Sequence, residues 1–312
     1  MIWFMSVVGL IILLVAGDFL VRGALNLSLR LGIPALIVSL TIVAFGTSAP
    51  ELIIAIKAAL DGAAGIALGN VVGSNTANVL LVLGIPAIIT ALDTRDCETR
   101  KTYVAMLLAT ALFIGLAFTG QFAIWQGLVL LGALALFLFD ATQDARKHRK
   151  ATNEDVELEG ADASISMGNV LLFLGLGLMG LPLGADILVN NATIIARQYG
   201  VSETVIGLTL VALGTSLPEL STTIMAATRR QADVALGNVI GSNLFNLLGI
   251  IGVASLFAPL DVDQSFVQVD LWVMLAASLV LVPFVFLGRQ LTRSWGIFLT
   301  VLYIGYVMYL IL

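Results

Sequence analysis

The chain has 312 residues, of which 59% are hydrophobic and only 11% are charged, and its formal net charge is -5. This composition, with a mean hydropathy of +1.05, excludes an ordinary soluble domain. A large buried core would need amphipathic helices to cover it, whereas most segments here are apolar on all sides. The single cysteine, Cys97, excludes a disulfide within the chain and a two-cysteine metal site. We therefore interpret the chain as an integral membrane protein.

About ten apolar runs are long enough to cross a bilayer as helices, which takes roughly 17 to 25 residues each. In chain order they are 2–21, 33–59, 66–90, 103–118, 122–139, 168–196, 203–227, 234–258, 266–287 and 294–312. The first run has no basic segment before it and no small-residue cleavage pattern after it, so we interpret it as a retained span rather than a signal peptide.

The basic residues are distributed unevenly over the loops between these runs. If successive loops alternate sides, thirteen of the fifteen Lys and Arg residues share one side, and only Lys57 and Arg197 lie on the other. The positive-inside rule makes the crowded side cytoplasmic. Because the loops are also short, we expect a multi-pass protein of the plasma (inner) membrane with both termini extracytoplasmic.

Two stretches of the chain occur twice. TIVAFGTSAPEL at 41–52 recurs as TLVALGTSLPEL at 209–220, and ALGNVVGSN at 67–75 recurs as ALGNVIGSN at 235–243. Both copies are 168 residues apart, which indicates two homologous halves. Because each half has five spans, an odd number, the second half enters the membrane from the opposite side. Inverted repeats of this kind are typical of secondary transporters, whose binding sites lie near the membrane midplane where helices are interrupted.

These features predict an all-α polytopic membrane protein with about ten transmembrane helices in two inverted-topology five-helix repeats, at 1–139 and 167–312. The segment between the repeats, 140–166, is polar, mixed in charge and without apolar periodicity, so we interpret it as a cytoplasmic linker. Its basic cluster is interpreted as an orientation signal or a contact with lipid headgroups.

The first repeated motif places a carboxylate beside a helix break. Gly46 and Pro50 should interrupt the second span immediately before Glu51. The second copy repeats this arrangement with Gly214, Pro218 and Glu219. A broken helix at this depth is tolerated only where it is buried in protein or lines a polar cavity, and a lone carboxylate there costs about 2.5–3.5 kcal/mol. Since no Lys or Arg occupies a core position, a bound cation is the expected compensation.

Hydroxyl and amide side chains are spaced so that they gather around the carboxylates. Thr47 and Ser48 precede Glu51 by four and three residues on one helix face, and Ser74 and Asn78 are four residues apart in the next span. The second copy supplies Thr215, Ser216, Ser242 and Asn246. Hydroxyl, amide, carboxylate and carbonyl oxygens are the hard donors that Ca²⁺ prefers. The only histidine lies in the linker, which argues against zinc, copper or an imidazole proton relay.

Several other polar residues of the spans have structural explanations. Asn70 and Asn238 either bridge helices or contribute to the site, whereas Asn75 and Asn243 lie off the polar stripe and are interpreted as structural. Asp18 and its counterpart in the second half lie near predicted span ends, where helix capping or interfacial solvation accounts for them.

With these motifs the sequence resembles the cation/calcium exchanger superfamily, which includes sodium/calcium exchangers and their prokaryotic relatives. The alpha repeats of that family are matched by GTSAPE (46–51) with GNVVGSNTAN (69–78), and by GTSLPE (214–219) with GNVIGSNLFN (237–246). The resemblance covers essentially the whole chain. It implies a secondary antiporter rather than an enzyme, without a cofactor, that exchanges Ca²⁺ for Na⁺ or H⁺ by alternating access. We expect it to work as a monomer in the lipid bilayer and to bind no nucleic acid.

The resemblance also implies roles for particular residues. Glu51 and Glu219 would be the principal Ca²⁺ ligands, assisted by backbone carbonyls of Thr47 and Thr215, with Asn78 and Asn246 at the centre. Flanking monovalent-ion sites would be formed by Ser48, Ser74, Ser216 and Ser242. In the family, spans 1 and 6 slide across a fixed core. Larger relatives carry Ca²⁺-sensing domains in the central loop, for which this linker is too short.

One departure from the sodium-coupled relatives concerns the two central amides. Those relatives commonly have an Asp at one of the positions, whereas Asn78 and Asn246 are both neutral, a pattern similar to proton-coupled members. The two carboxylates give the empty site two negative charges, which one Ca²⁺ or two monovalent cations would neutralise. A third monovalent cation would leave positive charge in a low-dielectric pocket. We therefore expect two monovalent ions per Ca²⁺.

Other functions fit parts of the sequence. Exchange of another divalent cation, or of Na⁺ for K⁺, would use the same ligand types. An intramembrane hydrolase could use paired carboxylates for acid–base chemistry, but it would need a lateral substrate gate, and the predicted core has no histidine for serine chemistry. A passive channel would need a continuous pore with several weak sites, whereas broken helices favour a closed, alternating site.

Overall fold

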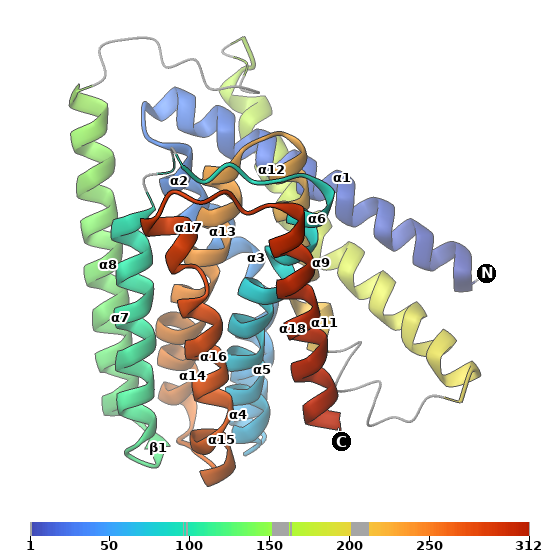
Figure 1. Cartoon of the computed structure of the whole chain (residues 1–312), viewed down its shortest axis with the longest axis vertical. Helices are drawn as coiled ribbons and strands as arrows, with labels where there is room; N and C mark the ends of the chain where they lie inside the picture. Colours follow the sequence, from blue (N-terminus) through green and yellow to red (C-terminus); the bar gives the residue numbers. More distant parts are fainter. Residues whose placement is uncertain are drawn as a thin grey trace.

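The computed structural model describes residues 2–95, 97, 99–151, 162, 164–200 and 212–311. Figure 1 shows a nearly all-helical molecule. Among the described residues, eight helices are long and apolar enough to cross a membrane, and a bent pair, 35–47 with 49–60, adds a ninth candidate. The predicted span 203–227 begins outside the described residues.

The first half contains five predicted spans, of which the second and third are divided into several helical segments. Its elements, with η denoting a π-helix, are α1 (Ile2–Leu31), α2 (Ala35–Val38), η1 (Ser39–Val43), α3 (Ala44–Thr47), α4 (Ala49–Leu60), α5 (Ala64–Ala77), η2 (Asn78–Val82), α6 (Gly84–Ile89), α7 (Arg100–Ala117), β1 (Gln121–Phe122) and α8 (Ile124–Ala151).

The second half has the same order of helices, but its short strand precedes the fourth span, whereas β1 follows the fourth span of the first half. Its described elements are α9 (Met167–Gln198), α11 (Ala212–Thr215), α12 (Leu217–Thr228), α13 (Ala232–Leu244), η4 (Phe245–Ile250), α14 (Ile251–Phe257), β2 (Leu260–Asp261), α15 (Gln264–Gln268), α16 (Asp270–Leu279), α17 (Val282–Phe286) and α18 (Arg293–Ile311). The π-helices η2 and η4 begin just after the two copies of the repeated GNVxGSN motif, and such π segments are frequent at functional sites.

Two helices are longer than hydropathy predicts. The helix α1 continues ten residues past the predicted boundary at 21 and ends where Gly32 takes a φ of 63°, a conformation that favours glycine. The helix α8 continues through Ala151 and so includes the start of the predicted linker. Apolarity marks only the part of a helix buried in lipid, whereas Ala, Arg, Lys and Gln favour helix in water as well.

The helices α1 and α9 form a tight pair inclined along one edge of the molecule (Figure 1). Their backbones approach closely at glycines: a Cβ added at Gly184 would lie 2.8 Å from the nitrogen of Leu13, and one at Gly9 would lie 2.7 Å from that of Leu188. Small residues permit such packing between membrane helices. Residue numbers rise along one helix as they fall along the other, so these corresponding helices run antiparallel, as inverted halves require.

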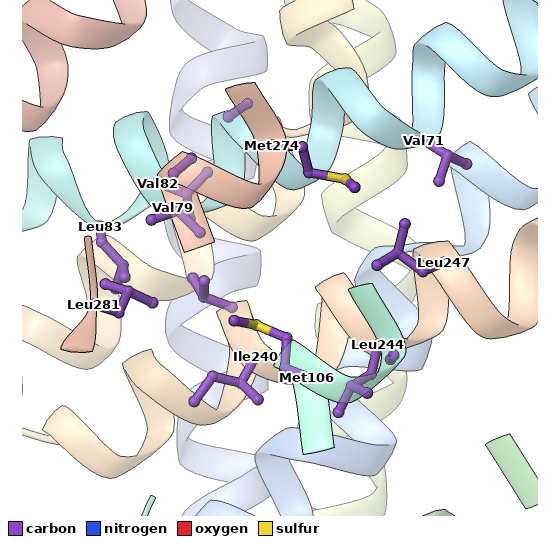
Figure 2. Packing of buried hydrophobic residues seen from close by; sticks show 14 of the residues in the cluster. Val71, Val79, Val82, Leu83, Met106, Ile240, Leu244, Leu247, Met274 and Leu281 are labelled. Carbon is purple, nitrogen blue, oxygen red and sulfur yellow. The ribbon is translucent and has the colours of Figure 1, made fainter. Parts of the chain in front are cut away.

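The buried apolar residues separate into two clusters. The smaller one joins α1 to α9, with Val38 and Val43 from the neighbouring broken helix. The larger one draws on both halves: Figure 2 shows α5 and η2 meeting α13 and η4, with Met106 of α7 and Met274 of α16 between them. Helices of both halves therefore share one core rather than forming two separate lobes, and α1 contributes Val21 and Leu25 to it.

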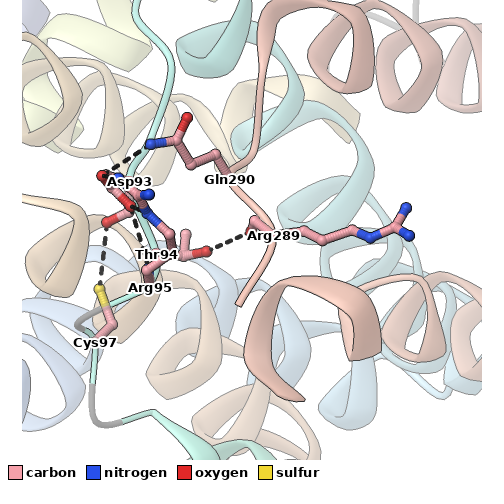
Figure 3. Close-up of polar contacts among 6 residues, drawn as sticks. All are labelled: Asp93, Thr94, Arg95, Cys97, Arg289 and Gln290. Atoms are coloured by element: carbon pink, nitrogen blue, oxygen red, sulfur yellow. Dashed lines mark hydrogen bonds and ion pairs between the residues drawn. The ribbon is translucent and has the colours of Figure 1, made fainter. Parts of the chain in front are cut away.

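Loops from the two halves pair at each end of the bundle. At one end, β1 and β2 pair antiparallel. At the other end, Leu92 pairs with Leu291, and the Thr94 hydroxyl donates to the carbonyl of Arg289 at 2.9 Å (Figure 3). There the side-chain hydrogen bonds from Arg95 hold the pKa of Asp93 well below its usual range. Each pairing joins two loops that the sequence analysis places on the same side of the membrane.

Candidate cation site

The two repeated motifs interrupt their helices at the same residue. Ser48 has φ −84° and ψ 5°, and Ser216 has φ −86° and ψ 1°, so neither continues the regular helix. The first break bends the span by 46°. Because Pro50 has no N–H group, it cannot donate a hydrogen bond to the carbonyl of Gly46 four residues earlier, and Pro218 has the same consequence in the second half.

Both breaks lie against the same helix, α9. A Cβ added at Gly214 would lie 2.7 Å from a methyl carbon of Val189, and one at Gly46 would collide with the side chain of Leu178. Glycine therefore allows α9 to lie across the two broken helices. This contact places α9, and with it the α1–α9 pair, directly beside the two helix breaks that the sequence analysis predicts.

The two motif glutamates come together at the contact between the halves. Glu51 and Glu219 are each only 1% exposed. The Ser48 hydroxyl of the first half donates to Oε1 of Glu219 at 3.1 Å, while the Thr215 hydroxyl of the second half faces Glu51. Each carboxylate is thus met by a hydroxyl from the other half's helix break.

The remaining predicted site residues lie around this pair. Thr47, Ser74, Asn78, Thr215, Ser216, Ser242 and Asn246 are all buried. The Thr47 and Ser242 hydroxyls face Glu219, and Thr47 also approaches the carbonyl of Ala44 at 3.2 Å. The structure therefore brings all ten predicted ligand residues into the buried interior, at the two breaks and on the two helices that follow them.

Unpaired buried polar atoms are concentrated in the repeated motifs. Within the described part of the chain, every buried side-chain oxygen or nitrogen without a hydrogen-bond partner belongs to one of the two motif copies. These atoms are Oε1 and Oε2 of Glu51, Oε2 of Glu219, Oγ of Ser216 and Ser242, Nδ2 of Asn70, Oδ1 of Asn75 and Asn78, and both amide atoms of Asn246. Leaving such an atom unpaired costs about 1–3 kcal/mol, so a cluster of them indicates a ligand site.

The donor set suits a hard cation. Across the described residues, neither glutamate forms an ion pair with Lys or Arg, and no three or more His, Cys, Asp or Glu side chains gather at one place. Two carboxylates supplemented by neutral hydroxyl, amide and backbone oxygens match the six to eight oxygen ligands that Ca²⁺ takes.

Three asparagines outside the predicted ligand set lie at the site or next to it. Asn238 donates to the carbonyl of Glu219 at 3.3 Å and to Thr223 at 3.1 Å, so it bridges helices as one reading of the sequence proposed. Asn75 and Asn243 contact each other, and Asn243 also contacts Asn78. Their exact repetition in both motif copies is the sequence signal that could have identified them.

Asp18 does not cap a helix, so the capping explanation offered by the sequence analysis is wrong. It lies within α1, where its carboxylate pairs with Arg22 at 2.9 Å and with Arg229 at 2.5 Å. Because α1 continues to Leu31, a position that appeared terminal is internal. Its partner Arg229 follows the end of α12, so this ion pair joins the long helix of the first half to the second half.

Comparison with known proteins places this chain in a family. The family model described as sodium/calcium exchanger protein matches residues 1–142 and 169–312. The chain is 36% identical to the putative antiporter CaxA of Alkalimonas amylolytica, over 96% of this chain and 95% of that protein. It is 33% identical to the sodium/calcium exchanger MaX1 of Methanosarcina acetivorans, over 97% and 96%.

A solved structure of the sodium-calcium exchanger NCX_Mj, soaked with zero Na⁺ and Ca²⁺, superposes with a TM-score of 0.84 at 32% identity, covering 98% of each chain. This match confirms the predicted all-α, polytopic membrane architecture, and the resemblance seen in the repeated motifs is confirmed with it. The chain belongs to the sodium/calcium exchanger protein family.

Proposed function

We propose that the protein is a secondary antiporter that exchanges Ca²⁺ for Na⁺ or H⁺ by alternating access. The observation that carries this proposal is the pair Glu51 and Glu219, one from each half, both buried and joined across the halves by the hydrogen bond from Ser48 to Glu219. Two such charges are costly in a membrane interior, and a cation bound between them would offset that cost. Family membership makes the chain a transporter, and this pair supplies the place where its cargo would bind.

Ca²⁺ would be held by both glutamates, the backbone carbonyls of Thr47 and Thr215, and the amide oxygens of Asn78 and Asn246. The hydroxyls of Ser48, Ser74, Ser216 and Ser242 would line flanking sites for monovalent ions. The unpaired oxygens of Glu51, Glu219, Asn78 and Asn246 support this assignment, because a cation would satisfy them all at once.

The charge of the site supports an exchange of two monovalent ions for each Ca²⁺. Only the two glutamates contribute formal charge, because Asn78 and Asn246 are neutral. One Ca²⁺ or two monovalent cations would neutralise them, whereas a third monovalent cation would leave an uncompensated charge in a low-dielectric interior. Carboxylates also accept protons, so the same pair provides the chemistry for H⁺ as the counter-ion.

The pair α1 and α9 is the element that would move. Its close backbone contacts make it one unit, and most of its buried apolar residues form a cluster of their own, with only Val21 and Leu25 of α1 in the larger core. Sliding of this pair would open the site to each side in turn. We further propose an inner-membrane location with both termini extracytoplasmic, and function as a monomer, because each chain supplies both halves of the site.

The experiment that tests this function is uptake of radiolabelled Ca²⁺ into proteoliposomes under an imposed Na⁺ gradient and, separately, under a pH gradient. We expect one of these gradients to drive uptake, and Glu51→Gln to abolish it. Asp186→Asn, which removes an exposed carboxylate outside the site, is the matched control and should transport normally. Ca²⁺ uptake driven by neither gradient would contradict the proposal, as would normal uptake by Glu51→Gln. Parallel assays with Sr²⁺ and K⁺ test exchange of other cations.

A further inference from the structure

Asn75 and Asn243, which lie outside the proposed ligand set, form a reciprocal contact between the halves. Nδ2 of Asn75 donates to the carbonyl of Asn243 at 3.2 Å, and Nδ2 of Asn243 donates to the carbonyl of Asn75 at 3.4 Å. The two residues are 168 positions apart, the offset of the internal repeat, and each is 1% exposed. The contact therefore lies on the pseudo-two-fold axis, where each residue meets its own counterpart.

This contact determines which atom each of the two side chains presents elsewhere. A main-chain carbonyl can only accept a hydrogen bond, so Nδ2 of each asparagine must face it and Oδ1 must point away. The free Oδ1 of Asn243 accepts a hydrogen bond from Nδ2 of Asn78 at 3.1 Å. The amide nitrogen of Asn78 is consequently engaged, and its Oδ1 is left buried without a partner.

The corresponding contact in the other half is incomplete. By the internal symmetry, Asn75 is related to Asn246 as Asn243 is related to Asn78. Oδ1 of Asn75 has no partner, and neither amide atom of Asn246 has one. A hydrogen bond from Nδ2 of Asn246 to Oδ1 of Asn75 would complete the symmetric arrangement and leave Oδ1 of Asn246 available, as Oδ1 of Asn78 already is.

We propose that Asn243 and Asn75 are positioning residues for ion exchange, which orient the amides of Asn78 and Asn246 with their oxygens toward the cation. An amide turned the other way would present N–H groups that repel a cation, so orientation decides whether a neutral residue is a ligand. Asn243 holds Asn78 in this orientation throughout, whereas Asn75 engages Asn246 when the cation binds. The inference rests on the proposed antiport function.

The test is a double-mutant cycle on the apparent affinity for Ca²⁺ in proteoliposome exchange. Asn243→Leu, Asn78→Leu and the double variant are compared with wild type. Because loss of a residue that orients a metal ligand weakens metal binding by about 10- to 100-fold, we expect such a loss in each single variant. If Asn243 acts through Asn78, the double variant should be no weaker than Asn78→Leu alone. A second cycle with Asn75→Leu and Asn246→Leu should give the same pattern.

Additive losses would overturn the inference, because a merely structural asparagine would weaken the protein independently of Asn78. Unchanged affinity in Asn78→Leu would overturn it as well, since no ligand would then need orienting. If Asn243→Leu does not fold, judged by gel filtration in detergent, Asn243→Ser replaces it in the cycle. Wild-type protein that exchanges no Ca²⁺ would refute the proposed function itself, an outcome distinct from additivity in an active exchanger.

Discussion

The Ser48 hydroxyl donates a hydrogen bond of 3.1 Å to the carboxylate of Glu219, across the contact between the two halves. The residue that interrupts one broken helix therefore contacts the acidic residue of the other. The equivalent hydroxyl in the second half, that of Ser216, has no hydrogen-bond partner. The two halves are thus related in sequence and fold but differ in their bonding at the site.

This difference predicts unequal effects of two equivalent substitutions. Ser48→Ala should lower the stability of the cation-free protein by about 1–3 kcal/mol, because it removes a hydrogen bond to a carboxyl group. Ser216→Ala removes a hydroxyl that is buried without a partner, so it should be neutral or stabilising. Thermal unfolding in detergent with a chelator present measures both variants. Equal shifts of the unfolding midpoint in the two variants would show that the Ser48 hydrogen bond contributes no stability beyond that of the unpaired Ser216 hydroxyl.

The packing of α13 against the broken helix of the first half predicts a steric effect. A Cβ added at Gly241 would lie 2.6 Å from the carbonyl of Leu40 and 2.7 Å from the Cβ of Ala44. Gly241→Ala should therefore cost about 1–3 kcal/mol through overpacking. The control is Gly132→Ala in α8, where the added carbon meets no described atom within 4 Å and better helix propensity should stabilise slightly. An equal shift of the unfolding midpoint in Gly241→Ala and Gly132→Ala would contradict the close packing at Gly241.

The ion pair between Asp18 and Arg229 predicts an energetic link between α1 and the rest of the molecule. The side chains are only 18% and 23% exposed, and the pair joins α1 to the end of α12. A double-mutant cycle of Asp18→Asn and Arg229→Gln should give a coupling energy of about 0.5–3 kcal/mol. The internal repeat offers a control, because the corresponding positions are both acidic, Asp186 and Asp61. Two carboxylates cannot form an ion pair, so their cycle should give no stabilising coupling. A stabilising coupling as large as that of Asp18 and Arg229 would contradict the ion-pair explanation.

The neutral amides at the centre of the site predict that exchange is electroneutral. With two monovalent ions per Ca²⁺, the end point of Ca²⁺ uptake should be independent of a membrane potential imposed with K⁺ and valinomycin. Asn246→Asp adds a third negative charge, which a third monovalent ion would neutralise, so its end point should depend on potential. A wild-type end point that shifts strongly with potential would contradict the two-to-one ratio.

Much of the architecture follows from the sequence because its strongest signals are local. The repeated motif, with proline and glycine beside Glu51, is enough to predict an interrupted helix, and the structure interrupts it at Ser48. Inverted topology follows from counting spans. Hydropathy also finds the helices, but it misses the end of α1, because Gly32 rather than the membrane boundary ends that helix.

Contacts between the halves are what the sequence does not reveal. Spacing shows that Ser74 and Asn78 share a helix face, but it does not show that Asn243, from the other half, contacts Asn78. Asn243 is off the polar stripe of its own helix, and its role depends on a neighbour 165 residues away. The ion pair of Asp18 is missed for the same reason, since its partner Arg229 comes from the other half.

The most direct test of a cation shared between the halves is calorimetric titration of the detergent-purified protein with Ca²⁺. Wild type should bind one Ca²⁺ at the shared site, and Glu51→Gln and Glu219→Gln should each weaken that binding by about 150- to 5000-fold. This range corresponds to the cost of about 3–5 kcal/mol for removing one member of a buried charged set. Asp186→Asn should bind as wild type does. Wild-type affinity in either glutamine variant would contradict a site built from both carboxylates.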